Sequence, residues 1–214
     1  MGKKEMNLSG HRALITGAGQ GIGKACAEVM GSRGANLVLL DQNLETLQNT
    51  CTEIRGQGVN VEAYGVDLAD INQTQKILKK IMKHGCNDIL VNNAGFDRPG
   101  TIAKIDLKNF EEVIQIQVYA PFLLIKTLLP AMKKSGWGRI INVSSIYGLI
   151  GGKGEVAYSA AKAGIIGFTK AVAREVGNYG ITVNAVVPGL TRTPTIEQFM
   201  ADRYKKKIID ETPL

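Results

Sequence analysis

A tyrosine and a lysine stand four residues apart in the segment AYSAAKAG, residues 157–164. Residues at this spacing share one face of a helix, so Tyr158 and Lys162 would be neighbours. A free tyrosine has a pKa near 10, and a unit positive charge ~4 Å away is worth ~4 kcal/mol at an effective dielectric of 20, or about three pKa units. We therefore predict that Lys162 lowers the pKa of Tyr158 and fits it for general acid and base catalysis. An ordinary amphipathic pair is the alternative.

A glycine-rich turn follows the first expected strand. The segment TGAGQGIG, residues 16–23, has glycines at every second position and leads directly into a helical pattern. Glycine permits positive φ and lets a ligand approach the backbone, while a helix N-terminus offers unpaired N–H groups to a pyrophosphate. The place of the turn between a strand and a helix predicts a dinucleotide site. A plain tight turn is the alternative.

An acidic residue, Asp41, ends the second expected strand about 20 residues past the turn. A carboxylate there would bind the adenosine ribose hydroxyls of NAD and repel the 2'-phosphate of NADP. No Arg or Lys occurs within residues 17–23 or directly after Asp41 to pair with that phosphate. The sequence therefore predicts NAD as the cofactor in preference to NADP, unless Asp41 only caps the helix that begins near Leu44.

The elements that must position these residues alternate along the chain. The expected strands are residues 12–16, 36–41, 59–67, 88–93, 139–145 and 181–187, and the expected helices are residues 21–33, 44–55, 71–83, 110–134 and 156–176. This alternation, with strands apolar enough to be covered on both faces, predicts a doubly wound parallel α/β sheet in a single domain over residues 1–214. Ligands bind outside the carboxyl ends of such strands, so the loops 94–105, 146–155 and 188–196 should border one site.

Composition narrows the classes of partner. The 214 residues are 44% hydrophobic and 21% charged, which suits one globular domain. The net charge of +7 comes from scattered basic pairs and triplets without interleaved aromatics, so we expect no nucleic-acid partner. No uninterrupted apolar run approaches the ~20 residues that a membrane helix needs, so we expect no membrane partner either.

The cysteines and histidines bear on redox state and metals. Three cysteines lie far apart, and neither of the two histidines has a neighbouring ligand at metal spacing. These residues predict neither a disulfide framework nor a metal site. A reducing, cytoplasmic location fits this cysteine usage best.

Six motifs resemble the short-chain dehydrogenase/reductase family in order and spacing. They are TGAGQGIG (16–23), VDLAD (66–70), NNAG (92–95), VSS (143–145), YSAAK (158–162) and NAVVPG (184–189). The resemblance covers essentially the whole chain. It implies a Rossmann-type fold and an oxidoreductase that passes a hydride between a secondary alcohol or ketone and a nicotinamide cofactor.

The resemblance also implies roles for the residues at matching positions. Ser145 and Tyr158 would contact the reacting oxygen, Lys162 would support Tyr158 and bind the nicotinamide ribose, and Ser144 would be a structural neighbour. Asn92 would stabilise the central strand. The cofactor-binding positions implied are Gly17, Gly19, Gln20, Gly21, Ile22, Gly23, Asp41, Asp67, Leu68, Asn93, Ala94, Gly95, Tyr158, Lys162, Pro188, Gly189, Thr191 and Thr193.

The chain departs from the family pattern in two places. The family usually has an Asn where the segment IQVYAPF (116–122) has Gln117, so we expect Gln117 to contribute to catalysis through an altered proton relay. Family members also continue past a segment like residues 212–214 into another helix, a seventh strand and a tail. We therefore expect the last strand and C-terminal tail of the family fold to be absent from this chain.

The substrate is the least determined feature. Similarity over residues 138–145, 158–176 and 180–189 is to 3-oxoacyl-[acyl-carrier-protein] reductases, whereas Asp41, and Tyr179 in place of a frequent Arg, point away from NADPH-linked carrier-protein reduction. The first interpretation is an NAD(H)-dependent enzyme for a 3-hydroxyacyl or 3-oxoacyl thioester or a related secondary alcohol. The alternatives are an NADPH-linked 3-oxoacyl reductase, a sugar or polyol dehydrogenase, and a non-catalytic dinucleotide-binding protein.

We expect one surface to line the substrate site and another to pair subunits. Residues expected to line the substrate site are Phe96, Asp97, Ile146, Tyr147, Leu149, Leu190 and the segment 194–200. The apolar run 118–125 and the helix that carries Tyr158 resemble the helices through which family members pair, which implies a homodimer or homotetramer.

Overall fold

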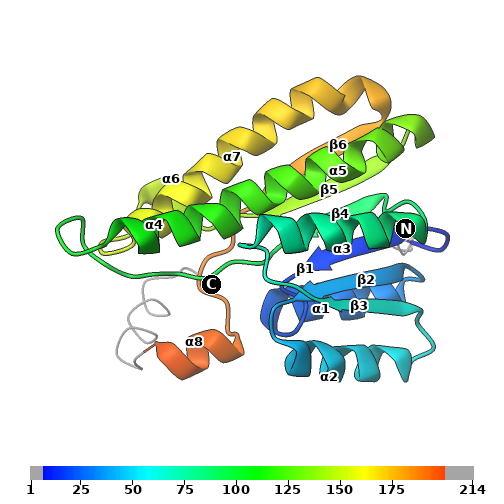
Figure 1. The fold of residues 1–214 in the computed structure, drawn as a ribbon, viewed down its shortest axis with the longest axis horizontal. Coiled ribbons are helices and arrows are strands. Elements are labelled where there is room, and N and C mark those ends of the chain that lie inside the picture. Colours follow the sequence, from blue (N-terminus) through cyan, green and yellow to red (C-terminus); the bar gives the residue numbers. More distant parts are fainter. Residues whose placement is uncertain (1–6, 201–214) are drawn as a thin grey trace, which may run out of the picture.

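The six predicted strands form one parallel sheet. A computed structural model describes residues 7–200 and orders the strands β3-β2-β1-β4-β5-β6 (Figure 1). The strands are β1 Arg12–Thr16, β2 Asn36–Asp41, β3 Val61–Gly65, β4 Ile89–Asn92, β5 Gly138–Val143 and β6 Ile181–Val186. All neighbouring strands run parallel, and the chain changes direction across the sheet between β1 and β4. The doubly wound fold is confirmed, and its ligand crevice is expected beside this change of direction.

Helices cover both faces of the sheet. They are α1 Gly21–Ser32, α2 Leu44–Arg55, α3 Ile71–Lys83, α4 Leu107–Ile114, the π-helical turn η1 Gln115–Tyr119, α5 Ala120–Ser135, α6 Tyr147–Ile150, α7 Val156–Val176, the 3-10 turn η2 Gly177–Tyr179 and α8 Pro194–Phe199. Core residues of α3, α5 and α7 pack together on one face, and those of α1 and α2 pack on the other (Figure 1).

The inner strands are buried on both faces because successive side chains point in opposite directions. Leu14 and Val38 pack toward α3, α5 and α7, whereas Ile15 and Leu39 pack toward α1 and α2, and all four are fully buried. Unbroken apolar strands such as RALIT and NLVLL are therefore what a sheet covered on both sides requires.

The stretch Leu107–Ser135, which comprises α4, η1 and α5, is long and apolar enough to cross a membrane by length and composition alone. The sequence analysis missed it because it considered only uninterrupted apolar runs. Leu124, Leu128 and Met132 of this stretch are buried in the core beside the sheet. Packing inside the domain accounts for these apolar side chains.

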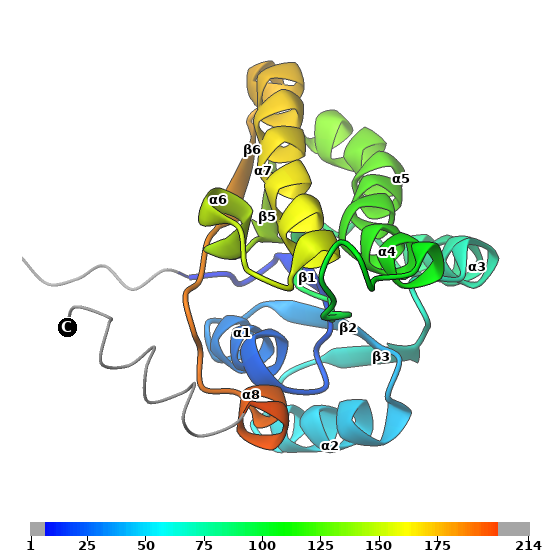
Figure 2. The ribbon, with the colours of Figure 1, turned by 90° about the vertical axis from the view of Figure 1, so that its left-hand side faces the viewer.

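The three predicted loops gather at one end of the molecule. Figure 2 faces this end, where α4, α6 and α8 lie, each beyond the carboxyl end of the strand that precedes it. Two short helices, α6 and α8, occupy loops that the sequence analysis left without structure, and β3 is shorter than predicted. The expected absence of the last strand and tail concerns the chain from residues 212–214 onward, and these residues lie outside the described part.

Candidate active site

The glycine-rich turn connects β1 to α1, and its shape depends on missing side chains. Gly17 and Gly21 have φ values of 63° and 56°, which L side chains rarely adopt. A Cβ on Gly23 would lie 2.0 Å from the carbonyl oxygen of Gly17. No side chain caps α1, and its first turn has no acidic residue, so backbone N–H groups are presented at its start. The turn fits the pyrophosphate of a dinucleotide.

Asp41 lies at the end of β2 and holds this turn. Its Oδ2 accepts a hydrogen bond from the Gly19 N–H at 2.9 Å, and its Oδ1 accepts one from the Asn43 N–H at 2.9 Å. The cap of α2 is Asn43, whose side chain accepts from the Thr46 N–H at 3.1 Å. The alternative that Asp41 serves as the helix cap is therefore wrong.

A hydrogen-bonded clamp joins the glycine-rich turn to the end of β4. Thr16 Oγ1 accepts hydrogen bonds from the N–H groups of Asn93 and Ala94, both at 3.0 Å. The Asn93 side chain donates to the carbonyls of Thr16 and Gly17 at 3.0 and 3.1 Å. The NNAG motif thus fixes the turn from the neighbouring strand.

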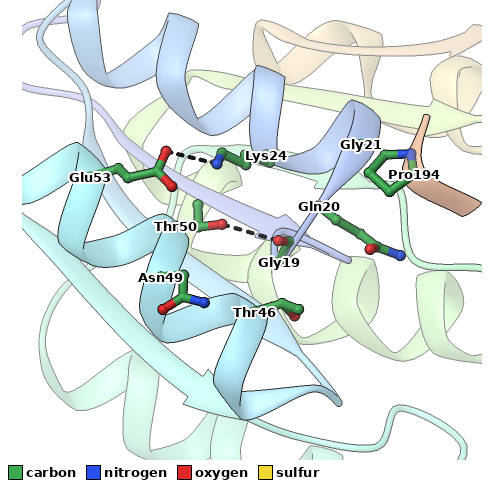
Figure 3. A pocket seen from close by; sticks show the side chains of 9 residues that line it. All are labelled: Gly19, Gln20, Gly21, Lys24, Thr46, Asn49, Thr50, Glu53 and Pro194. Carbon is green, nitrogen blue, oxygen red and sulfur yellow. Dashed lines mark hydrogen bonds and ion pairs between the residues drawn. The ribbon is translucent and has the colours of Figure 1, made fainter. Parts of the chain in front are cut away.

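A hollow of about 280 Å³ lies between the glycine-rich turn and α2 (Figure 3). Its lining residues are Gly19, Gln20, Gly21, Lys24, Thr46, Asn49, Thr50, Glu53 and Pro194. The Lys24 ammonium lies 2.7 Å from a Glu53 carboxylate oxygen and 3.9 Å from one of Glu28. The cation nearest the turn is thus engaged by two carboxylates. The sequence analysis did not single out Lys24.

Ser145, Tyr158 and Lys162 come together where β5 meets α7. Ser145 is buried, and its hydroxyl, which accepts from the Tyr147 N–H at 3.3 Å, lies near enough to the Tyr158 phenol to lower the pKa of that phenol. Lys162 follows one turn after Tyr158, with Nζ 5.4 Å from the centroid of the phenol ring. Its Nζ donates to the Val143 carbonyl at 2.7 Å, so the end of β5 holds the ammonium group.

The backbone around Lys162 is also held. The Ser144 hydroxyl donates to the Lys162 carbonyl at 2.7 Å, which fits the expectation that Ser144 is a structural neighbour. A Cβ on Gly148 of α6 would lie 2.6 Å from the Lys162 carbonyl carbon, so α6 can approach α7 only because this residue is glycine. At this contact the backbone of α6 lies directly against the backbone of α7.

The electrostatics differ from the expectation. Burial lowers the pKa of Lys162 to about 8. The pKa of Tyr158 is raised, chiefly by burial and further by the charges of Asp97 and Glu155, although the hydrogen bond with Ser145 lowers it. The predicted lowering by Lys162 is therefore wrong for the protein alone. The ammonium lies 5.4 Å from the ring centroid and is held by the Val143 carbonyl, and the carboxyl groups of Asp97 and Glu155 act in the opposite direction.

Gln117 sits in the π-helical turn η1 and is only 2% exposed. Its Nε2 donates to the Phe96 carbonyl at 2.8 Å, and its Oε1 receives no hydrogen bond from the residues that the structure describes. A Cβ on Gly95 would lie 3.1 Å from that oxygen. The Gln117 side chain thus holds the loop after β4. The extra residue of the π turn, which sequence periodicity did not reveal, places Gln117 against this loop.

Asp97 and Glu155 form a pair of carboxyl groups near Tyr158. A hydrogen bond joins them, which requires a shared proton, and burial together with Asp97 raises the pKa of Glu155 to about 8. Asp97 was expected at the substrate site, but Glu155 was missed. The signal was its position three residues before Tyr158, one turn away on the same helical face.

The other expected residues occupy the same edge of the sheet. Asp67 is exposed and forms a turn with the Ala69 N–H at 2.9 Å, while Leu68 is buried in the core. The buried Asn92 donates to Asn142 at 2.7 Å, which joins β4 to β5.

The segment after β6 runs back across this edge. Pro188 accepts from the Ile146 N–H at 3.0 Å, and Thr193 caps α8 and lies over Gly21. The remaining expected positions are the half-buried Ile22 of α1 and the exposed Gly189 and Thr191 of this segment. Within the expected segment 194–200, the side chains of Thr195 and Phe199 lie outside the description.

Known proteins share this arrangement. The family model described as short chain dehydrogenase matches residues 11–203. The 3-oxoacyl-[acyl-carrier-protein] reductase FabG of Thermotoga maritima is 35% identical over 98% of this chain and 85% of its own length.

Two solved structures are also similar. One is a putative NAD(P)-dependent gluconate 5-dehydrogenase from Beutenbergia cavernae, which is 31% identical, with a TM-score of 0.92 over 97% of this chain and 83% of its own. The other, an NAD+-bound xylitol dehydrogenase, is 31% identical, with a TM-score of 0.82 over 86% of this chain and 72% of its own. The chain belongs to the short-chain dehydrogenase/reductase family and is an oxidoreductase that acts on CH–OH groups with NAD(P).

Proposed function

We propose that the protein interconverts a secondary alcohol and a ketone with NAD(H), using Ser145, Tyr158 and Lys162. The observation that carries this proposal is their gathering at the carboxyl end of β5, at the same edge of the sheet as the glycine-rich turn. The bound nicotinamide supplies the hydride acceptor or donor and, when oxidised, a positive charge near Tyr158.

The chain's own groups handle the proton. In oxidation, the Tyr158 phenolate takes the hydroxyl proton while the Ser145 hydroxyl donates to the same oxygen, and the hydride leaves the carbinol carbon as the C=O bond forms. Reduction reverses these steps. Because Lys162 is fixed by Val143 and has a pKa of about 8, it can hold or pass a proton near neutral pH.

The choice of NAD is supported by charge at the end of β2. Both Asp41 oxygens accept backbone N–H groups beside the turn, where the adenosine ribose would lie, and a 2'-phosphate there would meet a carboxylate. The nearest cation, Lys24, is paired with Glu53 at 2.7 Å. NADPH-linked reduction is therefore the second candidate.

Two substrate classes have support. A 3-hydroxyacyl or 3-oxoacyl thioester is supported by the name of the T. maritima relative, and a sugar or polyol by the names of the two similar structures. Exposed Ile146 and Leu149 suit an acyl chain, whereas the carboxyl pair beside Tyr158 suits a polar substrate.

We also propose a homodimer or homotetramer in the cytoplasm. Tyr119 and Phe122 are 55% and 46% exposed, and the neighbouring face of α7 shows the small residues Ala160, Ala163 and Gly164. Large apolar side chains beside a flat helical face suit helix pairing between subunits.

Calorimetry with NAD and NADP, followed by assays of secondary alcohols and ketones, tests this function. Tight NAD binding with turnover is expected. NAD binding without turnover of any alcohol or ketone would instead support the non-catalytic alternative, and failure to bind either dinucleotide would overturn the cofactor assignment.

A further inference from the structure

Buried oxygen atoms without N–H or hydroxyl donors occur on the loop after β4, at the start of α7 and in η1. Asp97 Oδ1, Glu155 Oε2 and Gln117 Oε1 are buried and receive no hydrogen bond from an N–H group or a hydroxyl of the described residues. Gln117 is 2% exposed and contacts Gly95 and Phe96, the residues just before Asp97. Buried polar atoms normally have partners, and one proton held between the two carboxyl groups can serve only one oxygen of each, so the remaining acceptors call for donors from elsewhere.

A rigid backbone holds the pair in place. The Gly100 N–H donates to the Gly154 carbonyl at 2.7 Å, and Gly100 and Glu155 form a parallel β-bridge. Gln117 ties the same loop to η1 through Phe96. Glu155 stands at the start of α7, the helix that carries Tyr158. The two carboxyls are therefore positioned from both sides.

One proton shared between Asp97 and Glu155 joins the two carboxyls. Each of the two side chains is half-buried. The pair then carries one negative charge and offers open acceptors. Its charge acts on Tyr158, so a substrate held by the Tyr158 phenol lies within its influence.

We propose that Asp97 and Glu155 determine specificity by accepting hydrogen bonds from a hydroxyl or ammonium group near the reacting carbinol. The substrates are then vicinal diols, polyols or amino alcohols in preference to simple acyl chains. An acyl chain packed here would leave charged acceptors buried without donors, which is unfavourable. This inference rests on the proposed alcohol dehydrogenase function and narrows its substrate class.

The test compares matched alcohols. NAD-linked oxidation of 2,3-butanediol, 3-amino-2-butanol and 2-butanol is measured with the wild type, Asp97→Asn, Glu155→Gln and, as a control, Glu111→Gln on the exposed side of α4. For the wild type, we expect kcat/KM to be about 10- to 100-fold higher for at least one donor-bearing substrate than for 2-butanol, mainly through KM. The two site variants should bring this ratio toward 1, whereas Glu111→Gln should keep it.

The outcomes distinguish a hydroxyl donor from an ammonium donor, and they distinguish failure of this inference from failure of the proposed dehydrogenase function. A preference for the diol assigns a hydroxyl, and a preference for the amino alcohol assigns an ammonium group. A wild-type ratio near 1 for both, or a preference that survives both site variants, overturns the inference while leaving the dehydrogenase function intact.

If no alcohol is oxidised, the proposed function fails, and xylitol is titrated by calorimetry into each NADH-saturated protein. Xylitol binding that weakens about 10-fold or more in Asp97→Asn and Glu155→Gln, but not in Glu111→Gln, still supports the acceptor role. Absence of binding, or equal binding by all four proteins, overturns it.

Discussion

The glycine-rich turn and the carboxyl pair Asp97 and Glu155, which we call the wall beside Tyr158, lie at the same edge of the sheet. They differ in how their polar groups are paired. At the turn, both Asp41 oxygens, the Thr16 hydroxyl and the Asn93 amide are bonded to backbone groups. At the wall, buried oxygens of Asp97 and Glu155 have no N–H or hydroxyl donor among the described residues, and the two carboxyl groups share a single proton. The protein alone shapes the cofactor side, whereas the substrate must complete the other side.

The sharpest test of the catalytic centre between these regions is Tyr158→Phe. The change removes the proton-transferring hydroxyl and keeps the ring, so kcat should fall about 10²- to 10⁴-fold. NAD affinity, measured by calorimetry, should change much less because the turn is intact. A variant that keeps most of its turnover would rule out the assignment.

The preformed turn is tested by Gly23→Ala. The new Cβ would lie 2.0 Å from the Gly17 carbonyl oxygen, so the turn must shift, and NAD affinity should weaken by about 10- to 100-fold. Gly167→Ala on α7 is the matched control, because among the described residues no atom outside its own stretch of helix lies within 4 Å of its Cβ position. It should bind NAD normally and gain about 0.5–1 kcal/mol of stability from helix propensity. Equal NAD affinity in the two variants would contradict the preformed turn.

The charge on the cofactor side is tested by Asp41→Asn. The amide keeps the shape and removes the carboxylate that opposes a 2'-phosphate, so the ratio of NADP to NAD affinity should rise about 10-fold. Competitive titrations measure the ratio. An unchanged ratio would mean that Asp41 only holds Gly19 and does not discriminate between the cofactors.

The carboxyl pair of Asp97 and Glu155 should make the free energy of unfolding depend on pH. The folded-state pKa of Glu155 is raised to about 8, so the folded protein binds this proton more tightly than the unfolded chain does. The resulting stability is complete below the unfolded pKa near 4.5 and is lost as pH rises through about 8. Between pH 5 and 9, urea unfolding should show the wild type losing on the order of 1 kcal/mol more than Glu155→Gln, after allowance for partial exposure. Parallel losses would contradict a shared proton.

The smallest effect expected is on the pH profile. Asp97 and Glu155 raise the pKa of Tyr158, so Asp97→Asn should move the alkaline rise of kcat for oxidation to lower pH. The other titratable groups beside Tyr158 are Glu155 at the start of α7, Lys162 one turn further along α7, and Tyr147 of α6. An unchanged pH profile of kcat would show that the charge of Asp97 does not affect the pKa of the Tyr158 phenol.

Sequence reasoning predicted most of the fold because its signals are local. Apolar strands such as 36–41 and helical patterns such as 44–55 match the structure to the residue, and the glycine-rich turn needs no long-range information. The π turn around Gln117 escaped prediction because one extra residue in a helix leaves the apolar pattern nearly unchanged.

The errors at the site have a common physical cause. Spacing places Lys162 on the same face as Tyr158, but the pKa of Tyr158 depends on burial and on Asp97, which lies 61 positions earlier in the chain. Glu155 likewise gains its unusual pKa only when the fold brings Asp97 against it. Such pairings arise from tertiary contact and leave no local signal.

The most direct test of the central claim is NADH formation from a secondary alcohol, measured in one preparation after NAD and NADP titrations, for the wild type and Tyr158→Phe. We predict stronger binding of NAD than of NADP and NADH formation that is lost with the Tyr158 hydroxyl. NADH formation that survives Tyr158→Phe, or a preference for NADP, would contradict the claim.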